Sequence, residues 1–266
     1  MNEKPLASSA KAFNLKDRIF DTGEVCPKCG AHIMGLKFFD LDGHPRIWRK
    51  PCPCRDAEIR AEDSKRKKRE REEARQRRRK WAEIPDMFAD ATLKGYRRVS
   101  GAEEAFEAVK EYLLNREENW RAGRGLILMG AVGCGKTHLG CAVLNCALED
   151  GYHAAYWNVP QQLERMMYGH ADEDEQQRIL DKAIMAQVLL LDDLGAEKAS
   201  DWTRKELVII LDERYRENKP TIVTSNLMLT EDELRNTCGA RAYSRLCSDH
   251  FKAVALTAAD FRRRKA

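Results

Sequence analysis

The 266-residue chain lacks any long apolar run. Its longest apolar stretches, such as Leu126–Met129 and Val188–Leu191, fall far short of the roughly 20 residues that a membrane-spanning helix needs. The first 25 residues contain no apolar block that could act as a secretory signal. We therefore expect no membrane association and a cytoplasmic location.

The chain also has little net charge, +4, although 34% of its residues are charged. That charge is unevenly placed: residues 1–59 carry +2, residues 60–82 carry +7 and residues 83–266 carry −5. The apolar share of 43% is high enough to build a core and excludes a wholly disordered chain. The distribution predicts three parts, namely an N-terminal module (1–59), a basic linker (60–82) and a larger domain (83–266).

The nine cysteines are an odd number, so complete disulfide pairing is excluded. Four of them are clustered early in the chain. Cys26-Pro27-Lys28-Cys29-Gly30 is typical of a zinc-knuckle turn, in which the glycine lets backbone N–H groups turn toward the sulfurs. Cys52 and Cys54 follow 22 residues later, which leaves room for a β-hairpin with strands at 34–40 and 44–48.

Four thiolates predict a closed, structural Zn²⁺ site formed by Cys26, Cys29, Cys52 and Cys54. The C-x-C spacing of the second pair is less usual, and His32 and His44 lie inside the loop as alternative ligands. The reading without a metal is four reduced cysteines in a small apolar core.

Residues 60–82 contain neither glycine nor proline and are rich in Ala, Glu, Lys and Arg, so they predict a helix. A helix that is polar on all sides cannot bury a face, which favours a bridge between two domains. Its basic runs, 65–69 and 77–80, predict contact with nucleic-acid phosphates. A solvated linker without a ligand is the alternative.

An apolar run at Gly125–Met129 leads directly into Gly130-Ala131-Val132-Gly133-Cys134-Gly135-Lys136-Thr137, and a helical pattern follows at His138–Leu148. This strand, glycine loop and helix form a phosphate-binding P-loop. Its backbone N–H groups surround the β-phosphate at the positive end of the helix. Lys136 is expected to neutralise the β- and γ-phosphate oxygens, and the Thr137 hydroxyl to ligate Mg²⁺.

Three further strands are predicted at 153–157, 187–191 and 220–224, with a helix at 161–167 after the first of them. The second strand ends at Asp192 and Asp193. Asp192 is expected to hold Mg²⁺ through water, and Asp193 to orient or deprotonate the attacking water. The third strand ends at Asn226, whose amide could contact the γ-phosphate or the water, although asparagine is also common in turns.

Taken together, these residues resemble the AAA+ ATPases of the bacterial helicase-loader family (DnaC/DnaI type), phage-encoded members included. The resemblance covers about residues 84–257. It rests on the segments Gly133–Leu139, Leu190–Gly195, Arg214–Tyr215 with Lys219–Thr221, Thr224–Leu227 and Arg241–Leu246. It implies an α/β fold, a P-loop AAA+ domain with a central parallel sheet and no C-terminal lid.

By the same resemblance the chain hydrolyses ATP with Mg²⁺. ATP contacts are implied for Gly130, Gly133, Cys134, Gly135, Lys136, Thr137 and His138. Cys134 is read as a small filler residue, with redox control as the alternative, and His138 as a packing residue.

Asn226 matches the family's first sensor. Arg245 matches an arginine that reaches across a subunit interface to the neighbour's γ-phosphate. Arg241, one helical turn earlier, is the competing assignment, and the alternative for either arginine is to cap a helix or pair with carboxylates. The resemblance therefore implies self-association through Arg245.

The function implied is loading of a hexameric replicative helicase onto single-stranded DNA, with ATP hydrolysis as the release switch. The alternative is an IstB-like transposition helper, which acts with a transposase on double-stranded DNA. The four-cysteine module favours the loader. The basic tail, Arg262-Arg263-Arg264-Lys265, suits DNA better than the small acceptor of a P-loop kinase.

Overall fold

The computed structural model describes residues 19–168, 172–228 and 231–261, so the basic tail at 262–265 lies outside the described residues. The chain divides into two compact units, with the division between Glu72 and Glu73. In the described part of the chain, no helix has both the length and the apolar character needed to cross a membrane.

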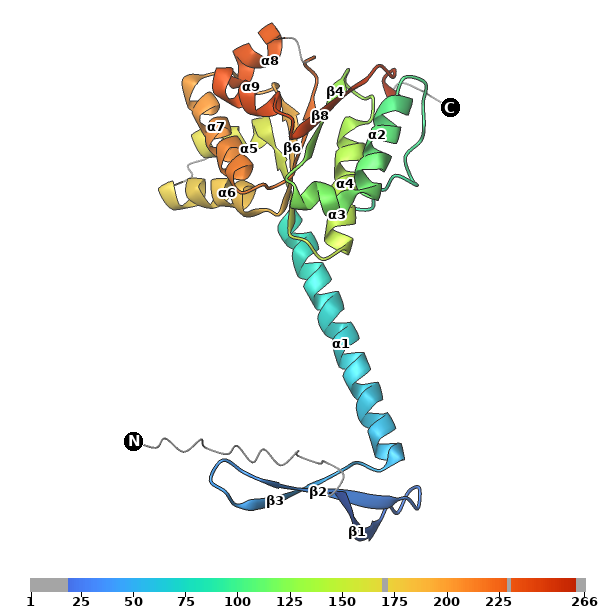
Figure 1. The fold of residues 1–266 in the computed structure, drawn as a ribbon. Coiled ribbons are helices and arrows are strands. Elements are labelled where there is room, and N and C mark those ends of the chain that lie inside the picture. The colour runs from blue at the N-terminus through green and yellow to red at the C-terminus, as the bar shows by residue number, and fades with distance from the viewer. Residues whose placement is uncertain (1–18, 169–171, 229–230, 262–266) are drawn as a thin grey trace, which may run out of the picture. The chain divides into compact units, whose positions relative to one another are not determined.

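The first unit contains a three-stranded antiparallel sheet in the order β1-β2-β3 (Figure 1). Its strands are β1 (Ile19–Val25), β2 (His32–Phe39) and β3 (Pro45–Arg49). β2 and β3 confirm the predicted hairpin, and Leu36 pairs with Trp48 across it. β1 pairs with β2 and had no counterpart in the sequence prediction.

The long helix α1 runs from Pro53 to Ala82 and therefore crosses the division between the units. Proline suits the first position of a helix because the N–H that it lacks would have no partner there. The helix begins seven residues before the predicted position 60, which places Cys54 in its first turn. It ends where Glu83 adopts a left-handed backbone, with φ of 52°.

The second unit is built on a parallel five-stranded sheet in the order β5-β6-β7-β4-β8. The four strands predicted from the sequence are confirmed as β4 (Gly125–Gly130), β5 (Ala154–Asn158), β6 (Val188–Leu194) and β7 (Thr221–Ser225), and β8 (Phe251–Leu256) adds a fifth. β6 is two strands away from β4, because β7 lies between them. The carboxyl ends of β4, β6 and β7 therefore lie along one edge of the sheet.

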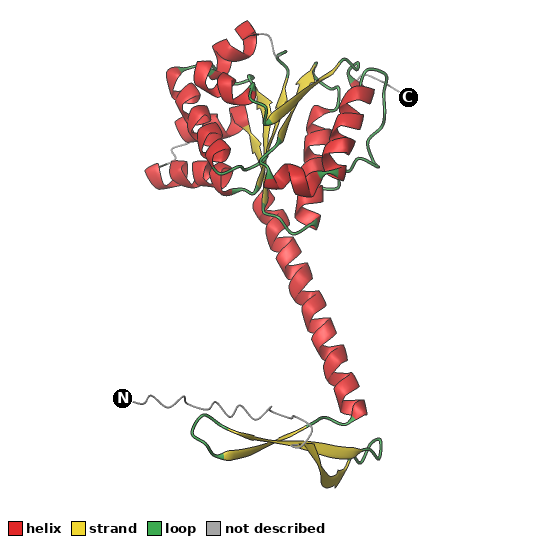
Figure 2. Ribbon diagram, viewed as in Figure 1, coloured by secondary structure: helices red, strands yellow, loops and turns green. Residues whose placement is uncertain are grey.

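Helices cover both faces of this sheet, as Figures 1 and 2 show. One face carries α2 (Glu103–Leu114), α3 (Arg116–Arg121) and α4 (Lys136–Glu149), and the other carries α5 (Val159–Tyr168), α6 (Glu173–Met185), α7 (Asp201–Arg216), α8 (Glu231–Cys238) and α9 (Ala240–Leu246). Alternate residues of β4 supply the two cores: Leu126 and Leu128 face α4, while Ile127 and Met129 face the other layer. Because both faces are covered, the central strands β4, β6 and β7 are almost entirely buried.

Arg214, part of the motif Arg214–Tyr215 with Lys219–Thr221, lies in the core of the second unit and is only 1% exposed. Its guanidinium donates to the carbonyl oxygens of Ala183 (2.8 Å), Ala186 (2.7 Å) and Pro220 (2.7 Å) and to the Thr221 hydroxyl (2.8 Å). A buried cation needs such compensation. This arginine therefore joins α7 to the segments that precede β6 and β7.

Candidate functional site

The phosphate loop lies between β4 and α4, in the order that the sequence predicts. Gly133 and Gly135 have left-handed backbones, with φ of 79° and 98°. A Cβ atom at Gly133 would lie 1.9 Å from an Asp260 carboxylate oxygen, and one at Gly135 would lie 2.7 Å from the Tyr96 hydroxyl. Only glycine fits at these two positions, and the loop can therefore turn its backbone N–H groups toward a phosphate.

Lys136 stands at the start of α4 and is 5% exposed. Its ammonium donates to the carbonyl oxygens of Gly130 and Ala131, both at 2.8 Å, and to Asn226 Oδ1 at 2.9 Å. Asn226 directly follows β7. The bond therefore joins the P-loop to the sheet edge at which β6, the strand that carries Asp192 and Asp193, also ends. The arrangement places the lysine and the predicted sensor asparagine at one site.

Asp192 is the best-supported carboxylate of the site, at 2% exposure. Three hydroxyl groups donate to it. Thr137 Oγ1 lies 2.9 Å and Thr224 Oγ1 2.7 Å from Asp192 Oδ1, and the Tyr156 hydroxyl lies 2.8 Å from Oδ2. Burial and the Asp192 charge raise the pKa of Tyr156, so this hydroxyl stays protonated and donates.

This group of oxygen atoms fits a hard divalent cation. Mg²⁺ takes oxygen ligands, keeps several waters and is usually held by one or two protein groups together with substrate phosphates. The Thr137 hydroxyl and the Asp192 carboxylate lie beside the lysine that would face the same phosphates. These two residues would hold Mg²⁺, as the sequence predicts.

Asp193 lines the same cavity and has an unusual backbone, with φ of 59°. A left-handed non-glycine residue costs about 1–3 kcal/mol and persists only where its surroundings hold it. Its N–H donates to Thr224 Oγ1 at 2.9 Å, so one threonine fixes both acidic residues. The strained turn aims the second carboxylate at the cavity.

A cavity of about 470 Å³ opens beside the loop, within the size range of small-ligand pockets. Besides the loop it is lined by side chains that the sequence analysis missed, on the segment 87–99 and after β8: Met87, Phe88, Tyr96, Arg97, Val99 and Phe261. Aromatic and apolar walls next to a phosphate loop suit the base of a nucleotide. Phe261 N–H donates to the carbonyl oxygen of Gly133 at 3.0 Å, which joins this wall to the loop.

Two side chains of α4 hold the segment 87–99 in place. Asn145 donates to the carbonyl oxygens of Phe88 (3.1 Å) and Ala91 (2.9 Å). His138 packs against the rings of Phe88 and Tyr96, with its Nε2 3.2 Å from the carbonyl oxygen of Thr92. The packing role expected for His138 is confirmed, and the residue also lines the cavity.

Cys134 is 1% exposed, and its sulfur lies 3.7 Å from the Lys136 ammonium. The buried thiol fills space beneath the loop, which fits the role of a small filler residue.

The two candidate arginines lie on α9, and neither lines the cavity of its own chain in the described structure. Both form ion pairs with Asp212 on α7: Arg245 through Nε at 2.7 Å and Arg241 through Nη2, also at 2.7 Å. Burial disfavours the Asp212 carboxylate, but the two arginines lower its pKa overall. Asp212 gave no signal in the sequence, because nothing local marks it.

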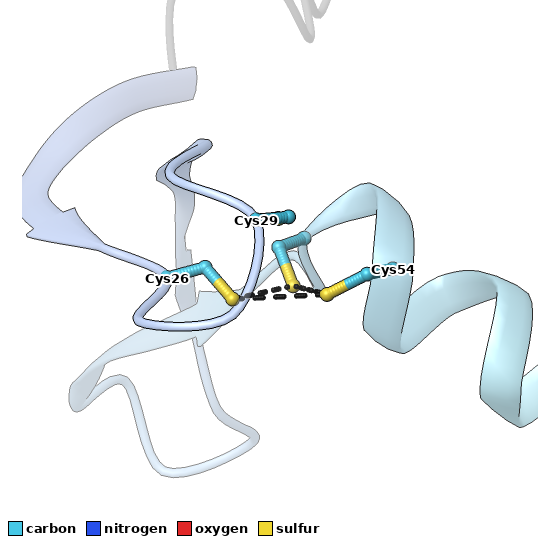
Figure 3. Close-up of side chains that lie close together, drawn as sticks. Cys26, Cys29 and Cys54 are labelled. Carbon is cyan, nitrogen blue, oxygen red and sulfur yellow. Dashed lines mark hydrogen bonds between the residues drawn. The ribbon is translucent and has the colours of Figure 1, made fainter.

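In the first unit the four early cysteines lie together, with all four sulfurs within 4.8 Å of one another. The sulfur of Cys26 lies 3.3 Å from that of Cys52 and 3.7 Å from that of Cys54, and the last two lie 3.2 Å apart. A tetrahedral zinc with Zn–S bonds of about 2.3 Å separates its sulfurs by roughly 3.8 Å. Figure 3 shows the sulfurs of Cys26 and Cys54 turned toward each other from the turn after β1 and from α1. The cluster fits zinc.

Neither histidine within the loop joins this cluster. His32 Nδ1 lies 2.8 Å from the Asp21 carboxylate, and His44 Nδ1 lies 3.6 Å from that of Asp40. The structure therefore assembles the four cysteines alone.

Backbone N–H groups of the knuckle turn, from Cys29 and Lys28, lower the pKa of Cys26 to about 6. This is the effect expected when the turn directs N–H groups at a sulfur. Contacts with the thiols of Cys52 and Cys29 raise the pKa of Cys54 to about 12. Adjacent thiolates repel one another, so full ionisation of the cluster needs a cation such as zinc.

The strand order, with the phosphate loop after β4 and the acidic pair at the end of β6, defines a P-loop ATP-binding domain of the AAA+ class. Residues 121–237 match the family described as IstB-like ATP binding protein. The crystal structure of the DnaC helicase loader is similar at a TM-score of 0.54 and 26% identity, over 65% of this chain and 99% of that one. Residues 121–237 are thus similar to IstB-like ATP binding proteins, and the fold of the second unit is similar to that of the DnaC helicase loader.

Two curated proteins are similar to part of the chain. The replicative helicase loader DnaI of Bacillus subtilis (strain 168) is 31% identical over 132 residues, which are 49% of this chain and 41% of that protein. An ATP-binding protein of insertion sequence IS1162 from Pseudomonas fluorescens is 35% identical over 107 residues, which are 40% of this chain and 46% of that one. The chain thus spans less than half the length of either relative.

Proposed function

We propose that the protein is an ATP-hydrolysing loader that binds a hexameric replicative helicase and assists its transfer onto single-stranded DNA. The observation that carries this proposal is the presence of a P-loop nucleotide site and a four-cysteine cluster in one chain. The first unit is the candidate docking module, and hydrolysis in the second is the release switch.

The residues of the nucleotide site have distinct roles in the proposed hydrolysis. Lys136 neutralises the oxygens of the β- and γ-phosphates, and Thr137 with Asp192 holds Mg²⁺. The bound metal offsets negative charge that develops on the phosphates. Asp193 accepts a proton from the attacking water or orients it, and Asn226 holds the γ-phosphate side of the site next to Lys136.

The helix α1 offers a surface for the phosphates of single-stranded DNA. Several of its acidic residues are paired; Asp63 and Glu70, for example, both contact Arg66. Lys67, Lys68 and Arg71 are exposed and form no ion pair within the described residues. At spacings i, i+1 and i+4 they share one side of the helix.

Salt dependence tests this surface. Replacing Lys67, Lys68 and Arg71 together by Gln should weaken binding of a labelled single-stranded oligonucleotide and reduce the slope of log K against log salt by about 2, at roughly 0.7 per lost phosphate contact. The matched control is Arg66→Gln, whose guanidinium is already paired. If the parent and the triple variant have the same slope of log K against log salt, these residues do not contact DNA phosphates and the helix is a solvated linker.

A second function is favoured by one observation, the match of residues 121–237 to IstB-like proteins. An IstB-like helper would act with a transposase on double-stranded DNA. The discriminating feature is the four-cysteine cluster, which we associate with a helicase-docking module.

A loading assay tests the principal proposal. Purified replicative helicase from the source cell or its phage is mixed with single-stranded DNA circles coated with binding protein, and strand unwinding is followed with and without the protein and ATP. We expect unwinding to require the protein and to fail with Lys136→Ala. Unwinding that is indifferent to the protein would contradict loading.

A further inference from the structure

Asp212 connects two helices at the surface of the second unit. It lies on α7, and its side chain is 11% exposed. Each of its carboxylate oxygens meets a different arginine of α9: Oδ1 accepts a hydrogen bond from Arg245, and Oδ2 forms an ion pair with Arg241. A nearly buried carboxylate held this way is fixed in orientation, because both oxygens are engaged.

Arg245 is constrained on two sides. Its Nε donates to Asp212 at 2.7 Å, and the guanidinium carbon lies over the Tyr215 ring, 4.5 Å from its centroid. Tyr215 in turn packs edge-on against His250 at 4.8 Å. The edge of the guanidinium is therefore bound at Nε and its face is stacked, while the two terminal nitrogens form no hydrogen bond within the described residues.

Arg241 is held differently. It uses a terminal nitrogen, Nη2, to reach Asp212, and its side chain is 71% exposed against 35% for Arg245. No ring stacks on it among the described residues. Of the two arginines, Arg245 is the one whose terminal N–H fork is held in a fixed direction.

A guanidinium fork fits two oxygens of a carboxylate or phosphate. In its own chain Arg245 lies outside the nucleotide cavity, so the anion that the fork would meet belongs to another molecule. We infer that Asp212 and Tyr215 are positioning residues that hold Arg245 with its terminal nitrogens presented to the γ-phosphate in the nucleotide site of a second copy of this chain. This inference rests on the proposed function, together with the self-association through Arg245 that the family resemblance implies.

The contacts favour Asp212 as a positioning residue for Arg245 over Asp212 as a partner in a purely structural ion pair. Both arginines are partly exposed, at 71% and 35%, so water solvates them when Asp212 is removed and the loss of stability is small. Orientation of a charged group that acts only in the transition state can change turnover far more than it changes folding. Loss of Asp212 should therefore lower turnover while ATP affinity stays near that of the parent.

The test compares Asp212→Ala, Arg245→Ala, their double variant and the control Glu213→Gln, which alters the neighbouring carboxylate that pairs with Arg216 at the surface. ATP turnover is measured at high protein concentration, and ATP affinity by titration. We expect Asp212→Ala to lose about tenfold in kcat with less than a twofold change in ATP affinity. The double variant should match Arg245→Ala, since Asp212 acts through Arg245, and Glu213→Gln should match the parent.

A subunit-mixing experiment separates positioning from damage to the fold. Lys136→Ala subunits cannot use ATP but keep an intact Arg245, whereas Asp212→Ala subunits keep an intact nucleotide site. Mixing the two should restore turnover, because an intact Arg245 then faces an intact site. Adding Asp212→Ala to the Lys136→Ala subunit should abolish that restoration.

Two results would overturn the inference. If Asp212→Ala turns over ATP like the parent while Arg245→Ala does not, Arg245 acts without Asp212, and the proposed self-association stands. If Arg245→Ala itself matches the parent, the inference and the assembly-dependent ATPase fail together, whereas the loading assay still reports separately on helicase transfer.

Discussion

Thr224 offers the sharpest test of how the acidic pair is held. Its side chain is wholly buried, its hydroxyl donates to Asp192 at 2.7 Å, and it accepts from the N–H of Asp193 at 2.9 Å. Thr224→Val keeps the shape and removes both bonds. A hydrogen bond to a charged group contributes about 1.5–3 kcal/mol, and an orphaned buried donor costs about 1–3 kcal/mol. We therefore expect the free energy of unfolding to fall by about 2.5–6 kcal/mol.

The assay is urea unfolding of the parent and two variants. Their free energies of unfolding are compared with the same slope of free energy against urea concentration for all three proteins. Thr224→Ser is the matched control, since it keeps the hydroxyl and loses one methyl group, at a cost of about 1 kcal/mol. If Thr224→Val and Thr224→Ser were equally stable, the two hydrogen bonds would not hold the acidic pair.

The same substitution has a consequence for the metal. With Thr224→Val, Asp192 keeps two of its three hydroxyl donors and the strained turn at Asp193 loses its support. We expect the gain in ATP affinity that Mg²⁺ provides to shrink by about tenfold, or 1.4 kcal/mol. An unchanged Mg²⁺ effect in a folded Thr224→Val protein would refute the assignment of Asp192 as the metal-side carboxylate.

Three further outcomes are expected. Lys136→Ala should weaken ATP binding by at least about 100-fold in a calorimetric titration, because the ammonium supplies charge-assisted bonds to the phosphates; unchanged affinity would defeat the P-loop assignment. Cys26→Ser combined with Cys29→Ser should lower the bound zinc measured by atomic absorption, and an equal zinc content would exclude the cluster as the metal site. Zinc affinity should fall as the pH decreases through about 6, because the Cys26 thiolate, whose pKa is lowered to about 6, is then protonated, and an affinity independent of pH would contradict thiolate ligation.

The parts of the site that were predicted from the sequence are motifs made of residues adjacent in the chain. The loop from Gly130 to Thr137 and the acids at the end of β6 occupy the positions that their spacing implied. Local chemistry suffices there, since a glycine loop between a strand and a helix has few other uses. The hairpin of the first unit was found for the same reason, from the turn between two apolar runs.

The parts that escaped prediction depend on tertiary arrangement. Tyr156 and Thr224 reach Asp192 only because β6 lies between β5 and β7. The order of strands in a sheet cannot be predicted from any single segment of the sequence. The base side of the cavity comes from residues 87–99, which have almost no regular structure and hence no periodicity to detect. Asp212 meets Arg245 across two helices, so its role appears only once α7 and α9 are packed.

The helix α1 shows a third kind of difference. Composition predicted a helix over 60–82, but the structure begins it at Pro53. The prediction relied on the absence of glycine and proline within 60–82, whereas proline is favourable at the first helical position. As a result the second cysteine pair belongs partly to the helix, and Cys54 lies in its first turn.

The most direct measurement of the central claim is binding of the purified protein to a purified hexameric replicative helicase, by analytical ultracentrifugation with and without ATP. We expect a complex with the parent protein that the Cys26→Ser, Cys29→Ser variant fails to form, since we propose the first unit as the docking module. We also expect the parent complex to dissociate after hydrolysis. Absence of any complex with the helicase, together with stable binding to a purified transposase, would contradict the account.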